Sequence, residues 1–136
     1  MRYRLDDQVG FVLRQAHQRH AALFSSLMIE GLTAMQWAAM AKLAEVGACS
    51  QNLLGRHTAM DAATIKGVID RLTARGLVRA VADAEDARRR LIDLTPEGAE
   101  LCARAAPLAH EITARTLAPL SEDERELLVA LLKRLG

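Results

Sequence analysis

The chain has 136 residues, a net charge of +1 and 51% hydrophobic residues, of which few are aromatic, since Phe, Trp and Tyr together make up 3%. This length suits one domain with its own core, built mostly from helix-forming Leu, Ala and Met. Two cysteines are too few for a disulfide framework, and neither a secretion signal nor an apolar run near the roughly 20 residues of a membrane span occurs. We therefore expect a mainly α, cytoplasmic protein without a membrane partner.

The N-terminal third predicts two helices. Apolar residues recur at three- and four-residue steps over residues 6–29, which indicates an amphipathic helix that ends before Gly31. Thr33 and Gln36 then have the spacing of a capping box, in which each side chain bonds the backbone N–H of the other residue. A second helix is therefore expected over residues 34–46, with Gly47 as its stop.

Two short helices separated by a tight turn are expected next. Ser50 is a suitable cap for a helix over residues 51–58, and Asp61 for a helix over 62–75 that ends at Gly76. Two helices this close together predict a helix-turn-helix, whose second helix can enter the major groove of DNA.

The pattern after Gly76 changes to strands and then returns to helices. Residues 77–81 and 90–94 are rich in branched side chains and flank a charged loop over 82–89, which predicts a β-hairpin. Thr95 followed by Pro96 favours a helix start, and a capping box from Ser121 opens the last helix. The predicted order is four helices, a small β-hairpin wing and two helices.

The helix over 62–75 carries the candidate base-reading residues. If Ile65 and its apolar neighbours pack inward, small and basic side chains remain on the outer face. A lysine there can donate to guanine, a threonine can reach a base edge or phosphate, and an alanine can touch a thymine methyl. The alternative is an ordinary solvated helix face. The candidates are Ala62, Ala63, Thr64, Lys66, Gly67 and Arg71.

The hairpin tip carries three consecutive arginines, Arg88, Arg89 and Arg90. Arginines at this place can reach a narrow minor groove or flanking phosphates. A charge run in a loop is often no more than a solubilising feature, but its position directly after a helix-turn-helix favours DNA contact.

These residues closely resemble the MarR (multiple antibiotic resistance regulator) family of bacterial winged-helix repressors. The resemblance rests on Asp86 and Arg88 in the wing, on the run from Leu94 to Gly98, and on two runs before the wing, residues 70–72 and 75–78. It implies a winged helix-turn-helix fold with terminal dimerisation helices, and a homodimer on a pseudopalindromic double-stranded DNA operator.

The resemblance also divides the chain and assigns roles. It implies one domain over 1–136, with dimerisation helices over 1–30 and 96–136 around a DNA-binding lobe over 33–95. Arg88 becomes the arginine aimed at the minor groove, and Asp86 its ion-pair partner. Ala84 and Ala87 depart from the family pattern, in which a proline and a further arginine are common.

A small-molecule effector is implied as well, because such regulators often release DNA when a ligand occupies the crevice between the dimerisation helices and the DNA-binding lobe. The segment over 51–71 resembles the branch that controls catabolism of aromatic acids, so an aromatic carboxylic acid is the expected effector, and no cofactor is expected. For the apolar members the alternative is ordinary core, and for His17 and His20 it is an exposed histidine or one satisfied within the core. The candidate contacts are Arg14, His17, His20, Phe24, Trp37 and Met40.

The alternative classes of function are a metal or redox sensor on the same fold, and an enzyme. A metal sensor would need further ligands beside His17 and His20, such as Cys102, His110 or Glu111, and nothing in the spacing demands one. A redox sensor would need Cys49 or Cys102 exposed with a lowered pKa. No phosphate loop or hydrolase motif occurs, so we expect no enzyme and no catalytic residue.

Overall fold

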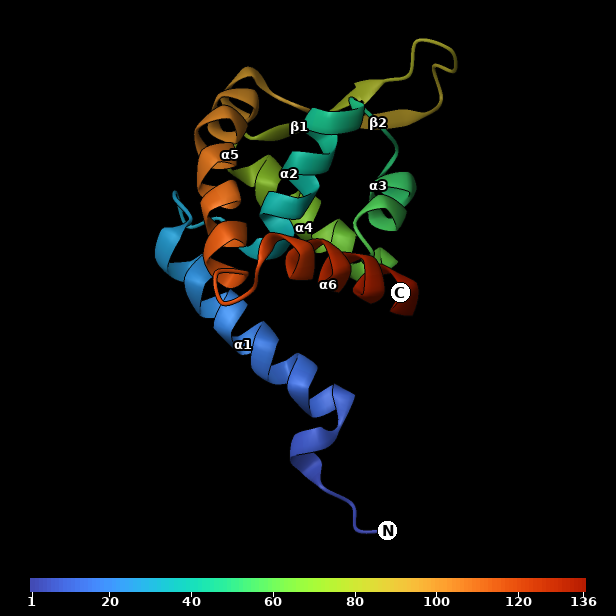
Figure 1. The fold of residues 1–136 in the computed structure, drawn as a ribbon. Coiled ribbons are helices and arrows are strands. Elements are labelled where there is room, and N and C mark those ends of the chain that lie inside the picture. The colour runs from blue at the N-terminus through green and yellow to red at the C-terminus, as the bar shows by residue number, and fades with distance from the viewer. The chain divides into compact units, whose positions relative to one another are not determined.

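The computed structural model describes residues 1–136 and contains seven helices and one two-stranded sheet. The helices are the short 3₁₀ helix η1 (Leu5–Asp7), then α1 (Val9–Leu27), α2 (Ala34–Val46), α3 (Gln51–His57), α4 (Ala62–Ala74), α5 (Pro96–Thr116) and α6 (Glu122–Leu135). The strands β1 (Val78–Ala82) and β2 (Arg90–Leu94) lie between α4 and α5 (Figure 1). The predicted mainly α fold with a small hairpin is confirmed.

Local signals fixed most helix ends correctly. Thr33 and Gln36, and likewise Ser121 and Glu124, form the reciprocal hydrogen bonds of capping boxes. The first helix was predicted too long, because Gln8 is extended at its start and the chain leaves the helix after Leu27. Glu30 and Gly31 then adopt positive φ angles of 57° and 62°, which a helix does not allow.

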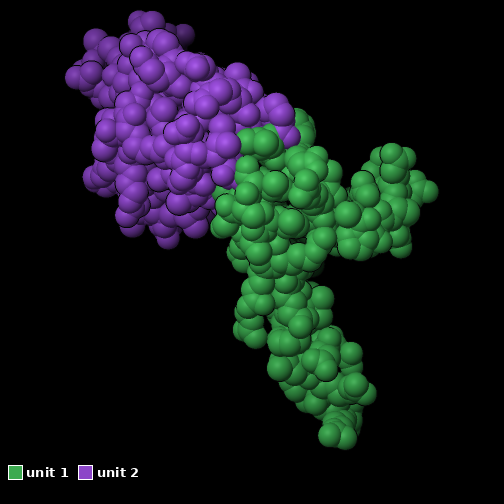
Figure 2. Space-filling view, turned by 90° about the vertical axis from the view of Figure 1, so that its left-hand side faces the viewer, with its two compact units in different colours: residues 1–27, 108–136 green, residues 28–107 purple.

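The chain divides into two compact units (Figure 2). The first unit comprises Met1–Leu27 and Leu108–Gly136, and the second comprises Met28–Pro107. Within α5 the boundary falls at Pro107, which has no N–H to donate to the carbonyl of Ala103. The second unit therefore includes the first half of α5, which the sequence had grouped with the terminal helices.

The second unit holds a continuous hydrophobic core. Met40 and Leu43 of α2 pack with Leu54 of α3, with the inner face of α4 and with Leu101 of α5. The hairpin joins this core through Val78 and Ile92. Because α3, α4 and the hairpin all pack on this one core, their positions relative to one another are fixed.

A backbone contact that the sequence did not predict anchors the hairpin. Cys49, just before α3, exchanges two hydrogen bonds with Ile92 of β2, with N···O distances of 3.1 Å and 2.7 Å. β2 in turn pairs with β1 in antiparallel register, from Val78 opposite Leu94 to Ala82 opposite Arg90. This bridge ties the start of the helix-turn-helix to the wing.

Candidate nucleic-acid interface

The turn between α3 and α4 is closed by backbone hydrogen bonds. The N–H of Met60 donates to the carbonyl of Gly55 at 2.9 Å, and Ala59 has the left-handed φ of 56° that ends such helices. A Cβ on Gly55 would lie 3.1 Å from Ile65 of α4, tighter than an ordinary contact. The small residue therefore lets the two helices approach closely, as a helix-turn-helix requires.

Asp61 fixes the start of α4. Its side chain accepts from the N–H of Thr64 at 2.8 Å. Hydrogen bonds from the backbone N–H and the hydroxyl of Thr64 hold the pKa of Asp61 below its usual value, so the cap stays ionised at neutral pH.

The two faces of α4 differ as the sequence predicted. Ile65, Val68, Ile69 and Leu72 are buried in the core of the second unit. The predicted DNA-contacting residues lie on the other face, where Ala62, Ala63, Lys66 and Arg71 are exposed and Thr64 and Gly67 are half-buried.

Lys66 is not a free cation. Its Nζ lies 2.8 Å from Oδ2 of Asp70, one turn further along α4, and both side chains are almost two-thirds exposed. Exposed pairs of this kind contribute little, about 0.3–0.5 kcal/mol, so a guanine or phosphate can compete for the ammonium group. This partner was not among the predicted contacts of Lys66, although the spacing of four residues indicates it.

Arg71 borders a groove of about 620 Å³ between α4 and the start of α2. A Cβ on Gly67 would lie 3.3 Å from the Arg71 guanidinium, which therefore extends along the surface of that glycine. The groove joins four predicted residues to the capping box of α2. Its lining comprises Thr33, Ala34, Met35, Gln36, Ala63, Thr64, Gly67, Val68 and Arg71.

The wing loop over residues 83–89 is held by its acidic residues. Asp86 Oδ1 accepts from the backbone N–H of Arg88 at 3.1 Å and lies 3.5 Å from its Nε. Asp83 lies 4.0 Å from Nε of Arg89, and the backbones of these two residues also bond at 3.0 Å. The Arg88 side chain remains 94% exposed, while Arg90 begins β2 and is exposed as well.

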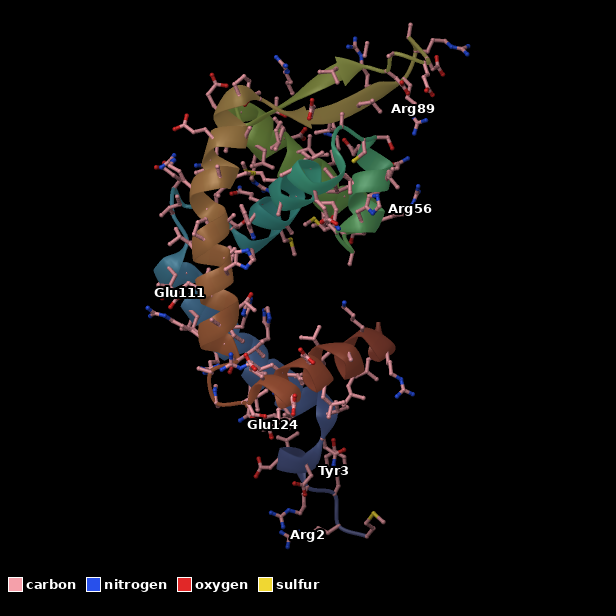
Figure 3. The ribbon with its side chains drawn as sticks, turned by 45° about the horizontal axis from the view of Figure 1, so that its top comes forward. Arg2, Tyr3, Arg56, Arg89, Glu111 and Glu124 are labelled. Atoms are coloured by element: carbon pink, nitrogen blue, oxygen red, sulfur yellow. The ribbon has the colours of Figure 1, made fainter.

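Arg56 is a basic residue outside the predicted set of DNA-contacting residues. It lies in the last turn of α3 and is exposed, and no carboxylate pairs with it. Figure 3 shows Arg56 on α3 and Arg89 at the wing. Its position in the last turn of the first helix of a helix-turn-helix was the available signal.

The predicted effector contacts are divided between the two units. Arg14, His17 and His20 lie on α1 of the first unit, where Phe24 is buried. Trp37 and Met40 lie on α2 of the second unit, where Trp37 packs against the core and Met40 is fully buried within it. For Met40 the structure thus shows the core packing that the sequence left open as its alternative.

Both cysteines are buried, and burial raises the pKa of each thiol. A raised pKa disfavours the reactive thiolate, so the redox alternative gains no support. No cluster of three His, Cys, Asp or Glu side chains is placed to hold a metal ion, and no helix is both long and apolar enough to span a membrane.

Comparison with known proteins shows the family to which this architecture belongs. The family model described as MarR family matches residues 30–89. The HTH-type transcriptional repressor NicR of Pseudomonas putida is 37% identical over 134 residues, which are 98% of this chain and 85% of NicR. The chain belongs to the MarR family. It is a transcriptional regulator of the MarR type, and the matched relatives are regulators rather than enzymes.

Two solved structures extend the comparison over the whole MarR fold. A probable transcriptional regulator from Pseudomonas aeruginosa is 55% identical, with a TM-score of 0.94 over 98% of this chain and 100% of that one. BpsR of Bordetella bronchiseptica is 40% identical, with a TM-score of 0.93 over 99% of this chain and 97% of its own. The BpsR structure concerns regulation of DNA binding by 6-hydroxynicotinic acid.

Proposed function

We propose that this MarR-family chain is a dimeric repressor whose α4 reads operator DNA in the major groove while the wing grips the minor groove. One observation carries the proposal: α4 turns its small and basic residues outward, beside a wing whose Arg88 is 94% exposed. The core of the second unit holds α4 and the hairpin on one base, so their contacts to DNA would form together.

The first unit supports the dimer. Except for Met35 and Val46, every exposed large apolar side chain belongs to it. These side chains give α1 and α6 apolar stripes without a partner inside one chain, and a large exposed apolar patch marks an interaction surface. A second copy would cover them and set two α4 helices about 34 Å apart, one helical turn of a pseudopalindromic site. They are Met1, Tyr3, Leu5, Val9, Val12, Leu13, Leu127, Leu128, Val129, Leu131, Leu132 and Leu135.

The similarity to the repressor NicR supports repression, and the similarity to BpsR supports control by an effector. An aromatic acid would offer a carboxylate to Arg14, which forms no ion pair in the structure and lies 5.6 Å from the centre of the Phe11 ring. His17, His20 and Phe24 would contact the rest of the ligand. Binding would release DNA only through a higher affinity for the released conformation.

The direct test is binding of the purified protein to fragments of neighbouring promoters, measured by fluorescence anisotropy at moderate salt with excess random DNA. We expect one fragment to bind at least a hundredfold more tightly than random DNA, and aromatic acids to release it. Equal affinity for promoter and random fragments would refute sequence-specific regulation.

Lys66→Ala is expected to relax base preference at one position in each half-site, by about 1–3 kcal/mol. The physical reason is that the ammonium, once it leaves Asp70, would donate to a base edge. The measurement is affinity for an operator series with each base pair changed in turn. An equal loss on specific and random DNA would show that Lys66 contacts only phosphate.

Arg88→Ala is expected to weaken binding to all sequences alike and to reduce the slope of log K against log salt by about one. The exposed guanidinium would no longer enter the minor groove or neutralise phosphate. Titrations at several salt concentrations measure the slope. Arg2→Ala, which removes the same charge from the first unit, is the matched control and should leave the slope unchanged.

A further inference from the structure

The last turn of α5 holds two side chains of α1 in the first unit. The Arg19 guanidinium donates to the backbone carbonyls of Arg115 and Thr116, at 2.7 Å for Arg115. His20 lies with its Nδ1 2.9 Å from Oγ1 of Thr116. Glu111, labelled on α5 in Figure 3, pairs with Arg115 at 2.8 Å and stiffens the same turn.

The hydrogen of the Thr116 hydroxyl is already used. Oγ1 donates to the carbonyl of Ile112 at 2.8 Å, and Ile112 is buried at 2% exposure. A threonine hydroxyl has one hydrogen, so toward His20 it acts as an acceptor. Nδ1 of His20 must therefore carry a proton.

The proton on Nδ1 determines the hydrogen-bonding role of the other ring nitrogen, Nε2. In a neutral imidazole one nitrogen donates and the other accepts, so Nε2 of His20 is the acceptor. The structure gives this nitrogen no hydrogen bond to the protein, and the side chain is only partly buried. His20 thus offers a fixed lone pair on the same helix as Arg14, which lies six positions earlier, or about 9 Å of helix rise away.

We propose that Thr116 is a positioning residue of the effector site, which holds His20 in the Nδ1–H form so that Nε2 accepts from a hydroxyl or ring N–H of the ligand. This inference rests on the proposed role of His20 in effector binding. It narrows the effector class to aromatic acids that carry a second, hydrogen-donating group besides the carboxylate held by Arg14. An acid without that donor leaves Nε2 unpaired, and sites built around a hydrogen bond reject such analogues strongly.

The tautomer is tested without any ligand, by long-range ¹H–¹⁵N correlation spectra of the full chain. In the wild type we expect the His20 signals of the Nδ1–H form, assigned by their loss in His20→Gln. Thr116→Ser keeps Oγ1 and should preserve the pattern. Thr116→Val keeps the shape without the hydroxyl and should shift His20 toward the Nε2–H form. An unchanged pattern in Thr116→Val would overturn the proposal.

The selectivity is tested with nicotinic acid and 6-hydroxynicotinic acid, which differ by one hydroxyl group, by isothermal titration calorimetry. The wild type and Thr116→Ser should prefer the hydroxylated acid at least tenfold, and Thr116→Val should lose most of that preference. Thr113→Val, an exposed position one turn earlier on α5, is the matched control and should behave as wild type.

The effector role of His20 and the positioning role of Thr116 are contradicted by different results. If wild-type protein binds neither acid, nor releases DNA in their presence, the effector role of His20 and the proposed selectivity are wrong, even when the tautomer is as expected. If both acids bind with equal affinity and release DNA, the proposed function stands and the positioning role of Thr116 is overturned.

Discussion

Leu131→Arg is expected to dissociate the proposed dimer and to lower operator affinity by about two orders of magnitude. Leu131 is 46% exposed in the centre of the apolar stripe of α6, and a guanidinium placed there would have to be buried when a second copy covers the stripe. A monomer then presents one α4 to one half-site and loses the avidity of two linked contacts. Light scattering gives the mass, and anisotropy with operator DNA gives the affinity.

The control for this variant is Glu126→Arg, which lies on the opposite side of the α6 helical wheel and should keep the dimer. The wild type gives a second test of the dimer that needs no variant, because the Tm of a dimer that unfolds to monomers rises with protein concentration. A Leu131→Arg protein with dimer mass and wild-type affinity would exclude α6 from the interface.

Gly98→Ala is expected to destabilise the protein by about 3 kcal/mol, near the upper end for overpacked sites. A Cβ at Gly98 would lie 2.0 Å from the backbone carbonyl oxygen of Leu77, so the start of α5 would have to move away from the strand entry. Thr95 reinforces this approach, because its hydroxyl donates to the carbonyl of Gly76 at 2.6 Å and accepts from the N–H of Gly98 at 3.0 Å.

Urea unfolding measures the effect, and Gly10→Ala is the control. Gly10 lies in α1 with open space around its Cβ position, so the alanine should be neutral or stabilise the protein by about 0.4–1 kcal/mol. Equal stability of Gly98→Ala and the wild type would show that α5 can shift without cost and that this glycine is not required for packing.

The close approach at Gly98 explains part of the sequence pattern that carried the family resemblance. The run from Leu94 to Gly98 ends β2, caps α5 and joins it to the entry of β1 through the backbone of Leu77. Position 95 requires a hydroxyl to make these hydrogen bonds, and position 98 requires glycine because a Cβ there would clash with the backbone of Leu77.

The sequence by itself determined the features that depend on residues within four positions of each other. The capping boxes at Thr33 and Ser121 and the cap at Asp61 are such features, since each side chain bonds a backbone N–H three residues away. The outward face of α4 was also predictable, because the helical period alone separates Lys66 and Arg71 from the core residues.

Only the tertiary structure decided contacts between distant segments. The bridge from Cys49 to Ile92, the approach of Gly98 to Leu77 and the hydrogen bond from His20 to Thr116 join segments whose separation in sequence carries no period or motif. The same holds for exposure. Helical spacing predicts apolar stripes on α1 and α6, but only the packing of the whole chain shows that these stripes remain uncovered within it.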